Sequence, residues 1–286
     1  MFTDKAVLLI SCIDKPGIVA AVSTYLYEKG ANIISSDQYS TNYQEGMFFM
    51  RVEFSLPGEG WTLSQVEEDF KPIADKYAMN WNLFPNSRKK RVAIFVSKED
   101  HCLVELLWQW KAGDFECDIV MVVSNHEELR SAVTGFGLPF YHFPVTKENK
   151  LEVEKRHIEL LKEHDIDVIV LAKYMQIVSP GFIEPFKDKI INIHHSFLPA
   201  FVGAKPYDRA YERGVKIIGA TAHFVTEELD AGPIIEQDII RVSHDYSAAE
   251  LKRVGRMVER SVIARALQWY LQNRVIIFGN KTIVFK

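Results

Sequence analysis

Hydrophobic positions in the first eighty-five residues recur with the periods of strands and helices in turn. Six elements are predicted there in the order strand, helix, strand, strand, helix, strand, over 6–13, 18–30, 32–43, 47–56, 63–77 and 79–84. The first helix follows a Pro-Gly turn and ends at Gly30. Proline is common where a helix begins and glycine where it ends. This order of elements is the ferredoxin-like βαββαβ arrangement.

From residue 92 onward the pattern changes to strands that alternate with helices. Strands are predicted at 92–96, 118–123, 167–171, 189–193, 217–225 and 234–242, and helices at 102–111, 126–135, 150–163 and 247–272. Such alternation indicates a Rossmann-like α/β domain with a mostly parallel sheet, whose ligands bind beyond the carboxyl ends of the strands. We therefore expect one domain over 1–85, a basic linker over 86–91 and a larger domain over 92–286.

Composition and charge narrow the class of protein. The 286 residues carry a net charge of −4, which argues against non-specific nucleic-acid binding. The basic stretch in 86–91 is interpreted as a solvated connector, because no aromatic residue interleaves with its charges. No apolar run approaches the length of a membrane span and the N-terminus carries no signal peptide, so we expect a cytoplasmic protein. The three cysteines form no CxxC pair, so neither disulfides nor a zinc site is expected. No other metal site is expected, because the histidines lack a ligand spacing with nearby carboxylates or thiols.

Candidate chemistry gathers at the end of the strand predicted over 189–193. Asn192 and His194 are two residues apart, so their side chains point to the same face of that strand. About thirty-five residues later Asp230 precedes a Gly-Pro turn. An amide, an imidazole and a carboxylate together can hold an oxyanion and move a proton, which suits acyl transfer or hydrolysis. Taken singly, the amide is more typical of a turn and the histidine of a satisfied core residue, but their combination with the downstream Asp230 is much less expected by chance.

The first eighty-five residues resemble an ACT domain. The resemblance is carried by the Asp-Lys-Pro-Gly-Ile sequence at 14–18, the helix after it and the Gly-Ala-Asn-Ile sequence at 30–33. It implies a regulatory module that binds an amino-acid effector where two such domains pair, and hence a homodimer or homotetramer. The alternative is a dimerisation unit that binds no ligand.

Residues 91–286 resemble the formyltetrahydrofolate-dependent formyltransferases, whose motif joins Asn-x-His-x-Ser-x-Leu-Pro to a downstream Asp-x-Gly-Pro. The resemblance implies that Asn192, His194 and Asp230 are catalytic, and it places His223 and Val225 in the site. It also implies that the segment 171–177 lines a pterin pocket, largely through backbone groups. The substrate-binding candidates in that segment are Met175, Gln176 and Ile177. For the side chains of Met175 and Ile177, ordinary packing at a strand edge is the alternative.

The group that accepts the formyl unit distinguishes members of this family. No glycine occurs in 95–103, where transferases for glycinamide ribonucleotide carry a glycine-rich phosphate loop, and His195 stands where their motif has proline. Together with the ACT-like segment, these features resemble the formyltetrahydrofolate deformylase family over nearly the whole chain. That family uses water as acceptor, releases formate and tetrahydrofolate, and supplies formate for purine synthesis.

Three residues near the acceptor are open to two interpretations. His195 either positions or excludes groups around the water, or packs at the strand end. Lys205 and Tyr207 could close the space of a second substrate, while Tyr207 equally suits a buried position at the start of a helix. The alternative functions are formyl transfer to an amine such as glycinamide ribonucleotide, and a non-catalytic folate or amino-acid sensor. No cofactor besides the folate substrate is implied.

Overall fold

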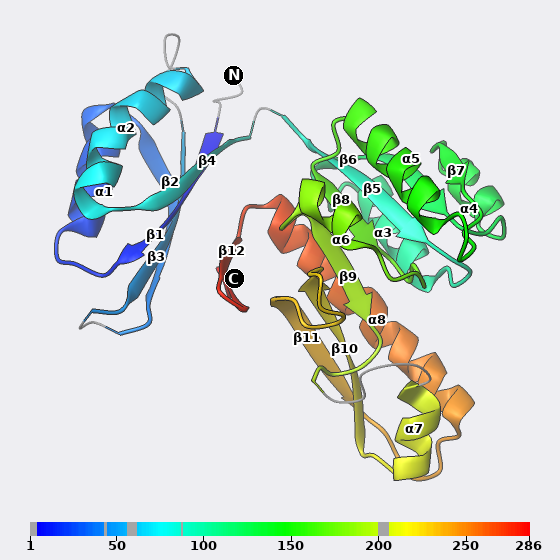
Figure 1. Cartoon of the computed structure of the whole chain (residues 1–286). Coiled ribbons are helices and arrows are strands. Elements are labelled where there is room, and N and C mark those ends of the chain that lie inside the picture. Colours follow the sequence, from blue (N-terminus) through cyan, green and yellow to red (C-terminus); the bar gives the residue numbers. More distant parts are fainter. Residues whose placement is uncertain (1–4, 43–44, 56–61, 87, 200–205) are drawn as a thin grey trace. The chain divides into compact units, whose positions relative to one another are not determined.

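The computed structural model describes residues 5–42, 45–55, 62–86, 88–199 and 206–286. Two compact units divide the chain between Lys89 and Lys90, and both can be followed in Figure 1. The short segments Asn273–Ile276 and Ile283–Lys286 group with the first unit. Within the described ranges, every helix is too short or too polar to cross a membrane.

The first unit is the ferredoxin-like fold that the sequence predicts. Its elements are β1 (Lys5–Ile13), α1 (Ile18–Glu28), β2 (Asn32–Ser40), β3 (Met47–Ser55), α2 (Leu63–Tyr77) and β4 (Asn80–Pro85). The described strands pair antiparallel in the order β2-β3-β1-β4. Leu8 and Ile10 of β1 share one buried cluster with Val22 of α1 and Phe70 of α2, so both helices pack on the same face of the sheet. The strand ends expected at 43 and 56 lie outside the described residues.

The second unit is a three-layer α/β fold around a mixed sheet. Its elements are β5 (Lys90–Val96), α3 (His101–Ala112), β6 (Cys117–Ser124), α4 (Arg130–Gly135), β7 (Phe140–His142), α5 (Lys150–Glu163), β8 (Val168–Leu171), α6 (Pro180–Ile183), η1 (Glu184–Phe186), β9 (Ile190–His194), α7 (Pro206–Arg213), β10 (Ile217–Phe224), β11 (Ile234–Arg241) and α8 (Ala248–Leu271). The short strands β12 (Val275–Phe278) and β13 (Lys281–Val284) pair with each other near the C-terminus. As described, the large sheet has the order β11-β10-β9-β8-β5-β6-β7. Strands β9, β8, β5, β6 and β7 are parallel, and β10 and β11 are antiparallel additions, which confirms the mostly parallel sheet.

The strand order reverses between β5 and β8, and this reversal determines where a ligand can bind. From β5 the chain adds β6 and β7 on one side, then crosses to β8 and β9 on the other. In open α/β sheets the crevice at such a reversal, beyond the carboxyl ends of the strands, is the usual ligand site. Here the reversal lies between β5 and β8, so a ligand is expected near the segments that follow Val96 and Leu171.

Lys90, a basic residue predicted as part of the linker, instead anchors the sheet to α8. Lys90 and Arg91 already belong to β5, so the connector is shorter than the expected 86–91. Lys90 Nζ donates to the carbonyl oxygens of Tyr270 and Leu271, each at 3.0 Å, in the last turn of α8. The last carbonyls of a helix commonly accept hydrogen bonds from side chains in this way. At its other end, α8 begins with a capping box formed by Ser247 and Glu250. The helix predicted over 247–272 is therefore confirmed together with both of its caps.

Candidate active site

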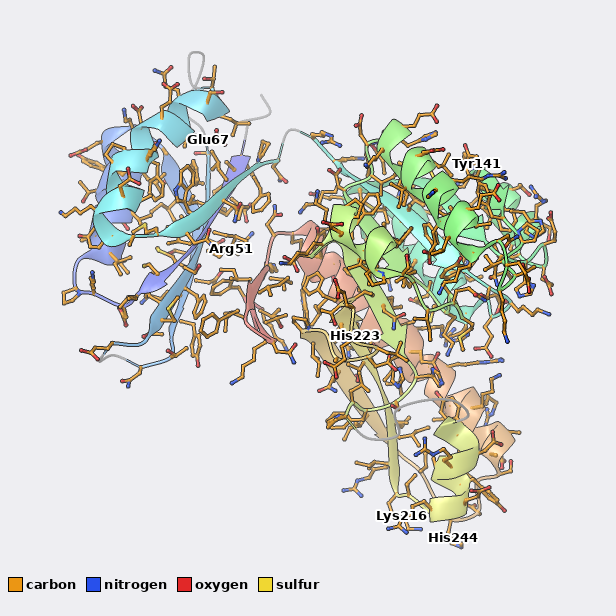
Figure 2. The ribbon with its side chains drawn as sticks, in the orientation of Figure 1. Arg51, Glu67, Tyr141, Lys216, His223 and His244 are labelled. Carbon is orange, nitrogen blue, oxygen red and sulfur yellow. The ribbon has the colours of Figure 1, made fainter. Side chains whose placement is uncertain are left out.

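Strands β9 and β10 bring the first polar pair together. They run antiparallel with Asn192 opposite His223, so the two side chains project from the same face of the sheet. The amide nitrogen Nδ2 of Asn192 lies 3.2 Å from Nε2 of His223. His223, labelled in Figure 2, is 2% exposed. Cross-strand pairing thus fixes a contact between residues 31 positions apart in the chain.

The backbone determines which way the Asn192 amide faces. His223 Nδ1 lies 2.8 Å from the carbonyl oxygen of Phe224, and because a carbonyl only accepts, Nδ1 carries the hydrogen. Burial lowers the pKa of His223, so its imidazole is neutral and Nε2 is an acceptor. Nε2 therefore accepts one hydrogen of the Asn192 NH₂ group. The second hydrogen of that group remains available for another acceptor.

His194 and Asp230 form the second polar pair. His194 Nδ1 lies 3.2 Å from Asp230 Oδ2, and Asp230 Oδ1 lies 3.8 Å from His223 Nε2. The hydrogen bond from His194 lowers the pKa of Asp230, so this carboxyl is ionised at neutral pH. The other ring nitrogen of His194, Nε2, is buried and has no hydrogen-bond partner among the described residues. A buried imidazole nitrogen without a partner is costly unless a bound molecule supplies one.

The loop that carries Asp230 is pressed against β10. Asp230 itself has a left-handed backbone (φ 57°), which is uncommon for residues other than glycine and is often found at functional sites. A Cβ at Gly232 would overlap the carbonyl of Phe224, so only glycine allows this close approach. Pro233 accepts a hydrogen bond from Phe224 N at 2.9 Å. These contacts explain why the carboxylate is followed by Ala-Gly-Pro, and they hold it beside His194.

His195 lies against the ring of His194. The two imidazoles are stacked with centroids 5.1 Å apart, and the centroid of the Tyr207 ring lies 6.3 Å from that of His195. Burial, together with the charge of Lys173, lowers the pKa of His195 to about 4, so this imidazole is neutral at physiological pH. Tyr207 is buried near the start of α7. Lys205 lies outside the described residues.

The remaining substrate-binding candidates fall in two different places. Met175 and Ile177 are each 61% exposed, so the alternative, that their side chains are ordinary core residues at a strand edge, is wrong for both. Met175 N donates to Ser97 Oγ at 3.0 Å, which joins the segments after β8 and β5 across the crevice, and the half-buried Gln176 follows it. Val225 lies instead at the opposite end of β9, where its N–H donates to the Ile190 carbonyl and its side chain joins a core cluster.

Sequence reasoning missed a group of charged side chains buried beside this site. Glu259 of α8 is 1% exposed and contacts His101 Nε2 at 2.8 Å, Lys173 Nζ at 3.1 Å and the Tyr207 hydroxyl at 2.5 Å. These contacts hold the pKa of Glu259 well below its usual range despite its burial. His101, Cys102 and Glu259 offer ligand atoms within 4.8 Å of one another. However, the Lys173 ammonium already neutralises Glu259 and burial raises the pKa of the Cys102 thiol, so the donor set suits an ion pair better than a divalent cation.

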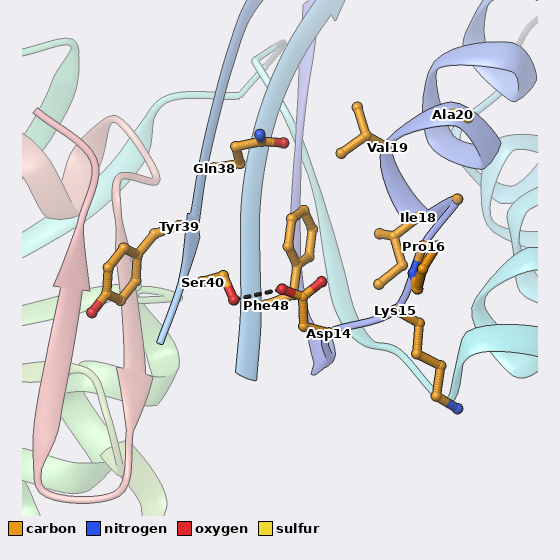
Figure 3. Close-up of a pocket in the computed structure, with 11 residues that line it drawn as sticks. Asp14, Lys15, Pro16, Ile18, Val19, Ala20, Gln38, Tyr39, Ser40 and Phe48 are labelled. Atoms are coloured by element: carbon orange, nitrogen blue, oxygen red, sulfur yellow. Dashed lines mark hydrogen bonds between the residues drawn. The ribbon is translucent and has the colours of Figure 1, made fainter. Parts of the chain in front are cut away.

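The first unit carries a separate hollow of about 500 Å³, shown in Figure 3. It lies between the 14–20 turn and the ends of β2 and β3, and its lining includes Asp14, Gly17 and Ser40. Asp14 accepts a hydrogen bond of 2.5 Å from Ser40 Oγ, drawn as a dashed line. Gly17 has φ 94°, and a Cβ there would lie 3.1 Å from the Tyr77 hydroxyl. The glycine therefore keeps the turn tight and one wall of the hollow free of a side chain.

Family comparisons agree with both units. Residues 90–267 match the formyl transferase family and residues 6–57 match the ACT domain. The fold and the polar cluster thus define a formyl transferase-type α/β unit preceded by an ACT domain.

Relatives that resemble the chain over its whole length narrow this class. A formyltetrahydrofolate deformylase of Bacillus subtilis is 56% identical over 282 residues, covering 99% of this chain and 94% of the relative. One from Mycobacterium tuberculosis is 52% identical over 97% of this chain and 90% of the relative. The crystal structure of a formyltetrahydrofolate deformylase from Pseudomonas syringae superposes with a TM-score of 0.94 at 46% identity, covering 99% and 95% of the two chains. The chain belongs to the formyltetrahydrofolate deformylase family.

Proposed function

We propose that this chain hydrolyses 10-formyltetrahydrofolate to formate and tetrahydrofolate, and so supplies formate for purine synthesis. Water attacks the N10-formyl carbon, the bond from that carbon to N10 breaks, and N10 takes a proton as tetrahydrofolate leaves. The observation that carries this proposal is that His194 Nε2 is buried and, among the residues that the structure describes, has no hydrogen-bond partner. Asn192, on the same face of β9, has a second amide hydrogen available. Two donors at one strand end match the oxygen of a formyl group that becomes an oxyanion.

Each polar group has a separate task in this reaction. Asn192 donates its second amide hydrogen to the oxyanion, and His194 in its charged form donates from Nε2. The ionised Asp230 stabilises the His194 charge through Nδ1 and takes the proton of the attacking water on its way to N10. The pterin lies in the crevice between β5 and β8, where the backbone around Met175 is held by Ser97. The folate is the substrate, and these steps need no additional cofactor.

Turnover with water alone tests the function. The purified protein is incubated with 10-formyltetrahydrofolate, and formate and tetrahydrofolate are measured together. We expect both products in equal amounts without any amine present. Turnover that begins only when glycinamide ribonucleotide is added would show a formyltransferase, and binding without turnover would show a sensor.

We also propose that the hollow at the 14–20 turn binds an amino acid as effector. Asp14 offers a carboxylate for an ammonium group, and the exposed backbone of the turn at Gly17 offers donors for a carboxylate.

Assembly into a homodimer or homotetramer is supported by β2, an edge strand of the described sheet. Its residues Ile33, Ile34 and Tyr39 are partly exposed apolar side chains. A monomer in sedimentation equilibrium at micromolar concentration would contradict the assembly.

Gly17→Val is expected to weaken binding of that amino acid at least roughly tenfold, because a β-branched residue strains a turn at φ 94°. Calorimetric titration of the wild-type chain and the variant with each common amino acid measures the effect. Tyr27→Ala, on the exposed side of α1, is the control and should bind as the wild type does. Equal affinity of Gly17→Val and wild type, or no binding by the wild type, would refute the effector site.

A further inference from the structure

Glu259 organises a buried set of charges in the second unit, on the His195 side of the catalytic imidazole. His101 comes from α3, Lys173 follows β8 and Tyr207 lies in α7, and all three contact this one carboxylate of α8. Glu99 adds a second carboxylate, 3.8 Å from Lys173 Nζ and 2.5 Å from Lys252 Nζ. The segments after β5 and β8, which flank the ligand crevice, are therefore joined by ion pairs at this end.

The backbone at Lys173 is shaped to send its side chain inward. Its φ is 65°, in the left-handed region that long side chains rarely adopt, and the residue is 6% exposed. A lysine in a strained conformation and without access to water requires compensating contacts. Glu259 at 3.1 Å supplies the main one. Strain and burial together indicate that the position of this ammonium is maintained for a purpose other than stability.

Tyr207 is held in place from two sides. Its hydroxyl donates to Glu259 Oε1, and its ring fills the space over Gly255, one helical turn earlier on α8. A Cβ at Gly255 would overlap the Tyr207 ring, so the absence of a side chain at this position of α8 makes room for the ring. The centroid of the Tyr207 ring lies 6.3 Å from that of His195, which in turn stacks on His194. A series of side chains, His195, Tyr207 and Glu259, thus leads from His194 to α8.

We propose that Tyr207, positioned by Glu259 and Lys173, closes the acceptor side of the active site so that water, and no amine, can reach the formyl carbon. This inference rests on the proposed hydrolysis and identifies what selects its nucleophile. Transfer to a primary amine would form a C–N bond to the amine, break the C–N10 bond and move one amine proton to N10. That reaction needs the same oxyanion donors as hydrolysis, and differs only in the room required for the acceptor. A wall of buried side chains excludes the amine sterically at no cost to water.

The test measures how the formyl group partitions between water and a small amine. Wild-type protein, Tyr207→Ala and Tyr211→Ala are each given 10-formyltetrahydrofolate and glycinamide, and formate and N-formylglycinamide are measured with an enzyme-free blank subtracted. Tyr211 lies on the same helix but is 54% exposed, so it controls for loss of a tyrosine from α7. We expect the ratio of N-formylglycinamide to formate to rise at least roughly tenfold in Tyr207→Ala alone.

A folded Tyr207→Ala that still yields only formate would overturn the inference, and thermal melting establishes that it is folded. If Tyr207→Ala does not fold, Gly255→Ala replaces it, because the added methyl displaces the ring from the other side, and the same ratio decides. Absence of formate from the wild type would instead refute the proposed hydrolysis. A general loss of stability cannot imitate the result, since it lowers both products and leaves their ratio unchanged.

Discussion

Asp230→Asn is expected to lower kcat for formate release by about 10³–10⁴-fold, with substrate affinity changed by less than roughly threefold. The amide keeps the size of the side chain but cannot take a proton or balance the charge on His194. Its NH₂ group also faces a ring nitrogen that must itself donate, so His194 would turn or change tautomer. Steady-state kinetics measure kcat, and equilibrium binding of tetrahydrofolate measures affinity separately.

Asp238→Asn is the matched control for that variant. Asp238 lies on β11, is paired with Arg265 at 2.8 Å and has an exposed side chain, so the same change there should leave kcat within roughly twofold. Near-normal turnover by Asp230→Asn would remove this carboxylate from the mechanism. A parallel loss of folate affinity would show that Asp230 acts in binding.

Local hydrophobic pattern predicts most of the fold, because each long element buries a periodic face of its own. The helix over 247–272 and the six elements of the first unit show this. Their apolar faces and capping residues lie within contiguous stretches of the sequence. Strands β7, β12 and β13 were missed because three or four residues contain too little period to detect. The local pattern predicts Lys90 and Arg91 as solvated, because their partners lie far along the chain: the last carbonyls of α8 and residues near 164–167.

The active-site cluster was only partly accessible to such reasoning. Spacing alone puts Asn192 and His194 on one face, whereas the contacts to His223 and Asp230 depend on the antiparallel register of β9 and β10. That register carries no local signal. The residue types suggest grouping Asp230 with Asn192 and His194, whereas His223 was indicated only by the family resemblance. For Glu259 the sequence does contain one signal of burial. This carboxylate lies next to Val258 and one turn before Ile263, on the apolar face of α8. A charge at such a position requires a buried partner, but the sequence does not say that the partner is Lys173.

Asn192→Ala is expected to reduce kcat by about 10²–10³-fold, the usual cost of removing one oxyanion donor. KM should change little, because the hydrogen bond strengthens only when charge develops on the formyl oxygen. The variant also leaves His223 Nε2, buried and acting as acceptor, without its donor at 3.2 Å. Steady-state rates of tetrahydrofolate release measure the loss, and thermal melting separates it from unfolding. Unchanged kcat in a folded Asn192→Ala would exclude this amide as an oxyanion donor.

A double-mutant cycle shows whether His223 acts through that amide. His223→Phe keeps a buried ring but removes the acceptor that orients Asn192, so we expect a loss in kcat of roughly tenfold, smaller than that of Asn192→Ala. In the Asn192→Ala background the same change should cost almost nothing, because no amide is left to orient. Losses that add in full would instead place the action of His223 at Asp230, 3.8 Å from its Nε2. The tautomer fixed by the Phe224 carbonyl favours the first outcome, since it makes Nε2 an acceptor that pairs with the amide and repels the carboxylate.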